Sequence, residues 1–299
     1  MARRSVLATA AFTAAAAFLA GCGGSDPSPA GNSAPRAESR SLDLGGVTVR
    51  TQGDSLRIAM FLAGTSNSFL QNNISAAKTE AERVGAKVDV FDGKFDPSVQ
   101  FNQMQTALGN KRYNAWIVQA NDAQQVCDIT TKQAPAAGIL VSAITLPLCG
   151  RNSNSGDELW APGTLNFVGG SGTYPVIKAW MDRVVAANPG PQKVALVAGP
   201  DLNAVTIAMQ KAYEDVHAEH PDFVSVGRIV TDYSVPSGLA KTQPFIVANP
   251  DLDIVLSISP ITQGVVQALQ AAKRINPPKV YDIGGSTWGV GAPCSHPGG

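Results

Sequence analysis

The stretch Ile58-Ala59-Met60-Phe61-Leu62 is followed by the turn Gly64-Thr65-Ser66-Asn67-Ser68 and then by a helical pattern. A continuous apolar run of this length predicts a strand that is buried on both faces. Ser68 is available as the N-cap of the helix. One face of that helix carries apolar residues at spacings of three and four: Ile74, Ala77, Ala81 and Val84. A buried strand that leads directly into an amphipathic helix is typical of a parallel α/β fold.

The same alternation of strand and helix continues to residue 283. Further strands are predicted at residues 88–91, 115–118, 139–144, 166–168, 194–197, 224–230, 254–258 and 280–283. Helices are predicted at residues 99–108, 123–132, 176–187, 208–216, 237–247 and 261–272, and Pro244 is expected to kink or shorten one of them. Strands alternating with helices of this length imply right-handed crossovers and parallel sheets covered on both faces. We therefore predict an α/β protein with two Rossmann-like lobes, at residues 55–170 and 171–291.

The amino-terminal segment has the pattern of an export signal. Two arginines precede an apolar run at residues 6–20, and Leu19-Ala20-Gly21-Cys22 has the layout of a bacterial lipobox. We therefore predict a signal peptide at residues 1–21 and lipidation of Cys22, which would hold the protein on the extracytoplasmic face of the cell membrane. An ordinary signal peptide, or a short anchor with an incidental cysteine, is the alternative. Residues 22–54 are rich in Gly, Ser, Pro and Ala and are predicted to form a flexible tether.

Composition argues against several classes of function. Charged residues make up 15% of the chain, and 23 basic residues balance 23 acidic ones, which argues against nucleic acid as a partner. The cysteines and histidines show no metal-ligand spacing, and residues 169–172 complete neither G-x-S-x-G nor G-x-G-x-x-G. We therefore expect no catalysis, no metal and no cofactor, and we interpret residues 169–172 as a crossing between the lobes.

Three cysteines follow Cys22. Cys127 is expected near the start of a helix and Cys149 just beyond the following strand, so both are expected near one edge of a sheet. Because thiols outside the cell tend to pair, we predict a disulfide between Cys127 and Cys149. Two buried free thiols are the alternative, and Cys294 is the odd cysteine.

Three short motifs carry a resemblance to a known family. They are the turn at residues 64–68 with Phe69-Leu70 opening a helix, Asn249-Pro250-Asp251-Leu252-Asp253 before a strand, and Val280-Tyr281-Asp282-Ile283-Gly284-Gly285. Over residues 56–290 the chain resembles type I periplasmic binding proteins of the ribose-, galactose- and xylose-binding group. The resemblance implies two lobes, joined by hinge strands, that close over a sugar or similar small polar solute and deliver it to an ABC permease. The alternative is a ligand-sensing module of the same fold that feeds a membrane receptor kinase.

The resemblance also implies site residues, at the carboxyl ends of the strands, where ligands bind in open parallel sheets. Asn67 and Phe69 stand where the family contacts its sugar, and Tyr233 aligns with a stacking aromatic. Thr145 ends a strand where sugar-binding relatives carry an Asp-Arg pair, so the charged clamp for sugar hydroxyls is absent there. The alternatives are a core Phe69, a turn-forming Asn67 and a surface-capping Tyr233.

Four further residues are candidates for the site. Asp201 and Asn203 follow a strand and either face the cleft or cap the next helix. Ser259 stands at a position where the family commonly carries a more polar pair, and Trp288 follows the last strand. The scaffold is retained while its polar groups are substituted, which weakens the prediction of a monosaccharide but not that of a small solute.

Members of that family continue beyond the last predicted strand, with further crossings between the lobes. Here residues 292–299 are rich in Gly and Pro and show no periodicity. We therefore expect a carboxyl-terminal truncation. Such a truncation would couple the lobes loosely and leave an apolar face and a sheet edge of the first lobe uncovered.

Overall fold

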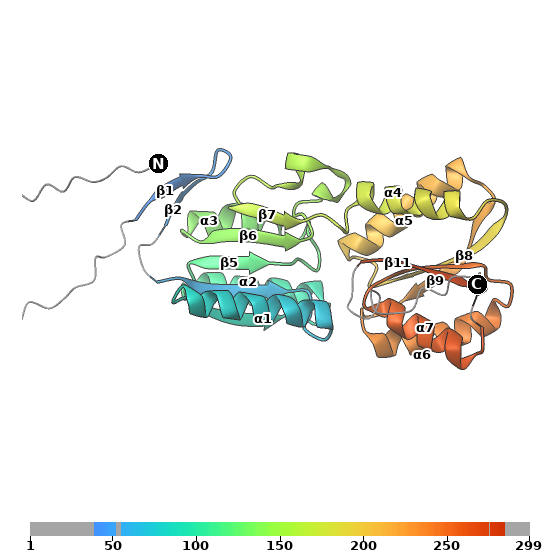
Figure 1. The fold of residues 1–299 in the computed structure, drawn as a ribbon. Helices are drawn as coiled ribbons and strands as arrows, with labels where there is room; N and C mark the ends of the chain where they lie inside the picture. Colours follow the sequence, from blue (N-terminus) through green and yellow to red (C-terminus); the bar gives the residue numbers. More distant parts are fainter. Residues whose placement is uncertain (1–38, 52–54, 275, 285–299) are drawn as a thin grey trace, which may run out of the picture. The chain divides into compact units, whose positions relative to one another are not determined.

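A computed structural model describes residues 39–51, 55–274 and 276–284 of the chain, and Figure 1 shows their arrangement. The described residues belong to one compact unit that contains two parallel sheets. The strands of the first are β3 (Arg57–Leu62), β4 (Lys87–Asp92), β5 (Ala115–Val118), β6 (Leu140–Thr145) and β7 (Asn166–Gly169). Those of the second are β8 (Gln192–Ala198), β9 (Phe223–Val230), β10 (Ile254–Ile258) and β11 (Lys279–Ile283). The predicted α/β fold with two parallel-sheet lobes is confirmed.

The strand order is the same in the two sheets. The first sheet runs β4-β3-β5-β6-β7 and the second runs β9-β8-β10-β11, with every neighbouring pair parallel. In each lobe the first strand, β3 or β8, lies inside the sheet. The second strand, β4 or β9, pairs on one side of it, and the later strands pair on its other side. This change of direction opens a crevice at the carboxyl ends of the strands in each lobe.

Helices cover both faces of the first sheet, but to different extents. On one face Phe61 and Trp116 pack with Met104 of α2 (Pro97–Asn110), the π-helix η1 (Ile129–Gln133) and the short α3 (Ala134–Ala136). On the other face Met60 and Leu62 pack with Ile74 of α1 (Ser68–Arg83). Packing against apolar side chains rather than intrinsic helix propensity is what holds such helices in place.

The α1 face of this sheet is partly open among the described residues. Its cluster draws on β3, β4, β5, β6 and α1, and Ile117 and Ile144 are only partly buried there. The last strand of the sheet, β7, exposes 60% of Val168.

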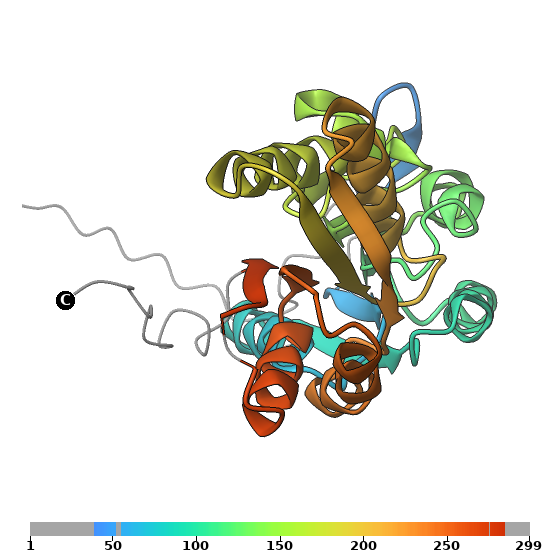
Figure 2. The same cartoon turned by 90° about the vertical axis from the view of Figure 1, so that its right-hand side faces the viewer.

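The second sheet is covered by two helices on each face. Helices α4 (Tyr174–Ala187) and α5 (Ala204–Glu219) pack on one face, where Ala208, Ala212 and Val216 are buried as predicted. Helices α6 (Val235–Ala248) and α7 (Ile261–Ala271) pack on the other, through residues such as Ile246 and Val265. Figure 2 shows the olive to brown pair and the orange to red pair on opposite sides of the strands.

The prediction of a tether over residues 22–54 is wrong for part of its length. Ser41–Asp43 (β1) and Thr48–Arg50 (β2) form an antiparallel hairpin. Val49 is fully buried, and the backbone N–H of Gly163 donates to the carbonyl oxygen of Leu44 at 2.7 Å. A few apolar side chains on a polar segment therefore order the hairpin against the first lobe.

Several helix predictions also need correction. The N-cap of α1 is Asn67 rather than Ser68, and Val84 is not buried but forms the exposed end of the helix. The helix predicted at residues 123–132 begins only at residue 127, after a turn at residues 123–126, and continues through η1 and α3. Helix α6 is not shortened by Pro244, because it continues to Ala248.

The polar loop after β6 contains two short 3-10 helices, η2 (Arg151–Ser153) and η3 (Gly156–Leu159).

Cys127 and Cys149 form a disulfide in the structure, with their Cα atoms 4.8 Å apart. The backbone N–H of Cys149 also donates to the carbonyl oxygen of Ala123, which closes the loop between the end of β6 and the turn after β5. Cys22 and Cys294 lie outside the described residues. Within the described ranges, no helix is long and apolar enough to cross a membrane, and no group of three or more His, Cys, Asp or Glu side chains is placed to hold a metal ion.

Candidate functional site

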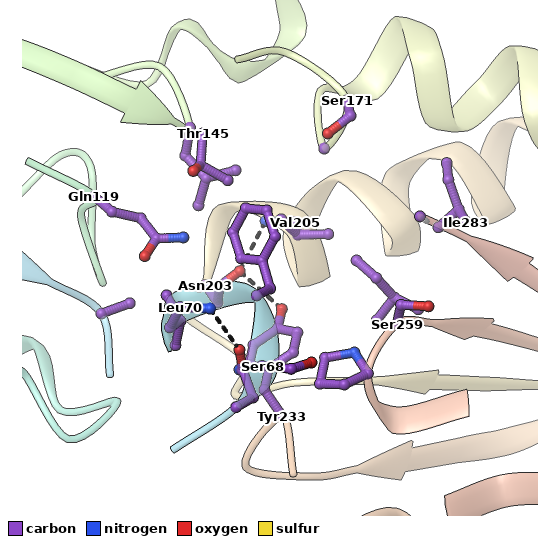
Figure 3. Close-up of a pocket in the computed structure, with 18 of the residues that line it drawn as sticks. Ser68, Leu70, Gln119, Thr145, Ser171, Asn203, Val205, Tyr233, Ser259 and Ile283 are labelled. Carbon is purple, nitrogen blue, oxygen red and sulfur yellow. Dashed lines mark hydrogen bonds between the residues drawn. The ribbon is translucent and has the colours of Figure 1, made fainter. Parts of the chain in front are cut away.

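A cavity of about 300 Å³ lies where the carboxyl ends of strands from both sheets meet (Figure 3). Thr145 ends β6 and Gln119 follows β5, while Ser259 follows β10 and Gly284 follows β11. Its volume is at the lower end of the range of small-molecule sites, which is roughly 300–1,000 Å³. The cavity therefore suits a small solute.

Two asparagines at helix starts occupy equivalent positions in the two lobes. Asn67 precedes α1 after β3, and Asn203 precedes α5 after β8. The side-chain oxygen of Asn67 accepts from the backbone N–H of Leu70, and that of Asn203 accepts from Val205, each at 3.0 Å. Since the oxygens cap the helices, each side chain still has an amide N–H₂ group, which is a pure donor. The capping role and a ligand-binding role are therefore compatible.

An aromatic pair forms part of the cavity lining between the lobes. Phe95 follows β4 and Tyr233 follows β9, again at equivalent positions, and their ring centroids are 5.5 Å apart. A tilted contact at this distance is within the favourable range for aromatic side chains. Both residues have left-handed backbone conformations, with φ values of 53° and 60°, a conformation that is uncommon outside glycine.

A glycine stands against each ring of this pair. A Cβ atom on Gly64 would lie 2.4 Å from the ring of Phe95, and one on Gly199 would lie 1.9 Å from the ring of Tyr233. Both distances are too short for any side chain. Gly64 after β3 and Gly199 after β8 therefore have to be glycine for the two rings to meet.

The hydroxyl of Tyr233 joins the aromatic pair to the helix start. It donates to the side-chain oxygen of Asn203 at 2.9 Å and lies 3.3 Å from the hydroxyl of Thr206. Burial raises the pKa of Tyr233 to about 12, so the phenol is neutral at physiological pH. Tyr233 is buried, which rules out the surface-capping alternative.

Gln119 contributes an amide to the cavity from the first lobe. Its backbone is fixed on both sides, since its N–H donates to Phe61 at 2.8 Å and its carbonyl oxygen accepts from the side chain of Gln100 at 2.9 Å. The side chain is only 6% exposed, and its Oε1 atom is buried without a hydrogen-bond partner. In Figure 3 the side chain extends into the cavity with its amide nitrogen leading.

Ser259 is held by a carboxylate behind the cavity wall. Its hydroxyl donates to Asp282 at 2.5 Å, and the hydroxyl of Thr262 donates to the other carboxylate oxygen at 2.5 Å. Burial raises the pKa of Asp282, and these two hydrogen bonds oppose that effect. Because the Ser259 proton points at Asp282, the hydroxyl offers acceptor lone pairs to the cavity.

Thr145 occupies a strained position at the end of β6. Its φ is 67°, which is unusual for a β-branched residue and costs on the order of 1–3 kcal/mol. It pairs with Gly169 on β7, where a Cβ atom would lie 2.6 Å from the carbonyl oxygen of Thr145. The backbone conformation of Thr145 at the end of β6 therefore requires a glycine at position 169 on β7.

A family model for the periplasmic binding protein domain matches residues 58–292. The chain belongs to the periplasmic binding protein domain family.

Solved structures with the same fold include an ABC transporter solute-binding protein from Mycobacterium smegmatis with bound glycerol. That protein is 24% identical over 74% of this chain and 72% of that one, with a TM-score of 0.57. The Caulobacter myo-inositol binding protein bound to myo-inositol is 20% identical over 78% of this chain and 75% of that one, with a TM-score of 0.63. A carbohydrate-transporter solute-binding protein from Agrobacterium radiobacter in complex with D-arabinose is 17% identical over 76% and 75%, with a TM-score of 0.61.

Most residues predicted for the site of this periplasmic binding protein lie together around the cavity. They are Asn67, Phe69, Thr145, Asn203, Tyr233 and Ser259. Phe69 is 47% exposed, so it is not a core residue. Their roles in binding are predictions.

Two predicted residues are not part of this group. Asp201 does not line the cavity, and its carboxylate pairs with Arg228 at 2.7 Å. Trp288 lies outside the described residues. Sequence reasoning missed Phe95 and Gln119, although Gln119 directly follows a correctly predicted strand and could have been found from the rule that ligands bind at strand ends.

The glycine requirement behind Tyr233 can be tested by substitution. Gly199→Ala should lower the free energy of unfolding by roughly 1–3 kcal/mol, because the new methyl group overlaps a ring that its hydroxyl holds in place. Urea unfolding followed by circular dichroism measures this change.

Gly109→Ala is the matched control. Gly109 lies in α2 with open space at its Cβ position, so alanine there should leave stability unchanged or raise it by up to about 1 kcal/mol. Equal stability of the wild type and Gly199→Ala would contradict the packing of Tyr233 described above.

Proposed function

We propose that this chain is an extracytoplasmic solute-binding protein that holds a sugar or similar small polar solute between its two lobes and delivers it to an ABC permease. The observation that carries the proposal is the cavity itself, which lies at the carboxyl ends of both sheets and is lined by amides, hydroxyls and an exposed aromatic ring. Amides and hydroxyls can pair with solute hydroxyls in either direction.

Phe69 supports a solute with both a polar and an apolar side. It lies in the first turn of α1 beside the donor amide of Asn67, and nearly half of its side chain is exposed. A large exposed aromatic side chain on the wall of a cavity can pack against an apolar surface of a ligand. The C–H face of a sugar ring is a suitable surface for this packing. The solved structures with this fold were found with glycerol, myo-inositol and D-arabinose, which are neutral polyhydroxyl compounds.

Binding rather than catalysis is the activity that we propose. Two groups in or behind the cavity wall have raised pKa values, Tyr233 and Asp282, and both are engaged in internal hydrogen bonds to Asn203, Ser259 and Thr262. The Tyr233 proton is donated to Asn203, and the Asp282 carboxylate accepts from Ser259 and Thr262 behind the cavity wall. They serve instead to orient the side chains that line it.

The proposal predicts a specific loss of affinity in Phe69→Ala. A thermal-shift screen of the wild-type protein with glycerol, myo-inositol, D-arabinose and common hexoses should find at least one compound that raises the melting temperature. Phe69→Ala should weaken binding of that compound by about 3- to 10-fold in isothermal titration calorimetry, because an aromatic contact is worth about 0.5–1.5 kcal/mol beyond burial.

Val247→Ala is the control for this experiment. Val247 is the most exposed large apolar residue in the described ranges, at 78%, and it does not line the cavity. Its substitution should leave affinity unchanged. Full affinity in Phe69→Ala, or no stabilisation of the wild type by any neutral sugar or polyol, would show that this cavity does not serve as proposed.

We also propose that Cys22 carries the lipid that keeps the protein beside its permease. The support is the sequence order of charged start, apolar run and Leu19-Ala20-Gly21-Cys22. Cys22→Ser should move the protein from the membrane fraction to the soluble fraction in immunoblots of fractionated cells, and should reduce uptake of the labelled solute. A Cys22→Ser protein that remains in the membrane fraction would contradict lipidation at this residue.

A further inference from the structure

Asp282 lies directly behind one wall of the cavity. In the parallel register of β10 and β11 it stands beside Ser257, two residues before the cavity residue Ser259. Its carboxylate accepts from the hydroxyls of Ser259 and Thr262, each at 2.5 Å. Asp282 is half-buried, and the side chain of Thr262 is buried on α7. Ser259 therefore connects this carboxylate to the cavity.

The charge of Asp282 decides which way the Ser259 hydroxyl points. An ionised carboxylate only accepts hydrogen bonds, so both hydroxyls have to donate to it, and Ser259 presents its oxygen lone pairs to the cavity. A protonated carboxyl group is itself a donor at one oxygen. Ser259 can then accept from Asp282 and turn its own proton toward the cavity. Protonation behind the wall therefore changes the hydrogen bonds that the wall offers.

The charge also sets the strength of the bond to a solute. A solute hydroxyl that donates to Ser259 completes a chain of hydrogen bonds that ends on the Asp282 carboxylate. Hydrogen bonds to an ionised group are roughly twice as strong as neutral ones, and bonds in a chain polarise one another. The same chain is weaker when it ends on a neutral carboxyl group. A solute should therefore bind more tightly while Asp282 is ionised.

The described segments around Asp282 give it no charged partner. Strand β10 and helix α7, which pack against it, contain no titratable residue. The ionisable side chains of the other neighbouring segments are exposed, as are Arg183 and Lys273, or bond elsewhere: Lys241 to Val230, Lys279 to Asn188, Arg274 to carbonyl oxygens at and beyond the end of α6, Lys178 to Asp182 and Glu219, and Tyr233 to Asn203. Burial raises the pKa of Asp282, while the two hydroxyl bonds oppose the rise.

We propose that Asp282 is a positioning residue that fixes Ser259 as an acceptor in the cavity, and that protonation of Asp282 weakens solute binding and promotes release. This inference rests on the proposed function, because it concerns solute binding in the same cavity. It goes further by assigning a role to a residue that does not line the cavity and by linking affinity to pH.

The direction of the pH dependence follows from the form of Asp282 that the solute prefers. Because the solute binds more tightly to the ionised form, affinity is full above the pKa that Asp282 has in the folded protein and falls as the pH drops through it. Burial raises that pKa above the usual range of an aspartate. The loss of affinity should therefore begin at a milder acidity than the protonation of an exposed aspartate.

Calorimetric titrations of the full chain from about pH 4 to about pH 8 test this link. The probe is whichever of glycerol, myo-inositol, D-arabinose and the common hexoses stabilises the wild type most in the thermal-shift screen. Its affinity should fall by about 3- to 10-fold as Asp282 takes up a proton, which is the difference between a charge-assisted and a neutral hydrogen bond. An affinity that is constant over this range, or that rises toward acid pH, would overturn the proposal.

Asp282→Asn tests the residue itself. Its side chain has one donor end and one acceptor end, as the protonated carboxyl group has. The variant should bind about 3- to 10-fold more weakly than the wild type at neutral pH, and its affinity should not change with pH. Its melting temperature without solute should stay equal or rise at neutral pH, because a partly buried charge is removed. A residue that only supports the fold would instead lower the melting temperature and leave the pH dependence of affinity in place.

Ser259→Ala shows whether Asp282 acts through the serine. This variant should lose affinity together with its pH dependence, and the double variant Asp282→Asn/Ser259→Ala should bind no more weakly than Ser259→Ala alone. Additive losses would overturn the route through Ser259. Asp222→Asn is the matched control, because Asp222 is exposed and does not line the cavity. It should keep the affinity and the pH dependence of the wild type.

The outcomes separate this inference from the proposed function. If a compound binds but the wild type and Asp282→Asn have the same affinity at every pH, solute binding stands and the role of Asp282 is overturned. If none of the compounds binds to the wild type at any pH, the proposed function fails and the inference fails with it.

Discussion

The contact between the rings of Phe95 and Tyr233 is the interaction on which the site depends. One ring comes from each lobe, and each follows the equivalent strand of its sheet. The contact requires Gly64 and Gly199 behind the rings and left-handed backbone at both aromatic residues. Left-handed backbone at a residue other than glycine costs conformational free energy. Such strain is found where the surrounding structure fixes a conformation that function needs. The pair joins the lobes at the lining of the cavity.

The rest of the site follows from a repeated topology. Because both sheets have the same strand order, their crevices open at the same strand ends, and Asn67 and Asn203 cap the equivalent helices. The tyrosine hydroxyl then ties the aromatic pair to Asn203, which leaves that side chain with its donor amide. A set of buried hydrogen bonds thus sets the direction of the polar groups, and such preorganisation reduces the cost of binding in general.

The regular elements were predictable because their signal is local. The runs at residues 115–118 and 254–258 coincide with β5 and β10, since continuous β-branched and aromatic residues between polar turns specify a buried strand. The hairpin of β1 and β2 was not predictable, because Val49 is buried by residues far along the chain. The N-cap of α1 was missed by one residue because Asn67 and Ser68 both suit a cap, and only the backbone conformation distinguishes them.

Site residues were predictable to the extent that they follow strands. Thr145, Asn203 and Ser259 were predicted in this way and line the cavity, whereas Phe95, which also lines it, carries no such signal in the sequence. Asp201 was also predicted for the site, but it does not line the cavity, and its carboxylate pairs with Arg228.

The most direct test of the account is a crystal structure of the protein with a neutral sugar that it binds. We predict that the solute lies in the cavity, with one face on Phe69 and hydrogen bonds to Gln119 and Asn203. A solute bound elsewhere on the molecule, with these three side chains untouched, would contradict it.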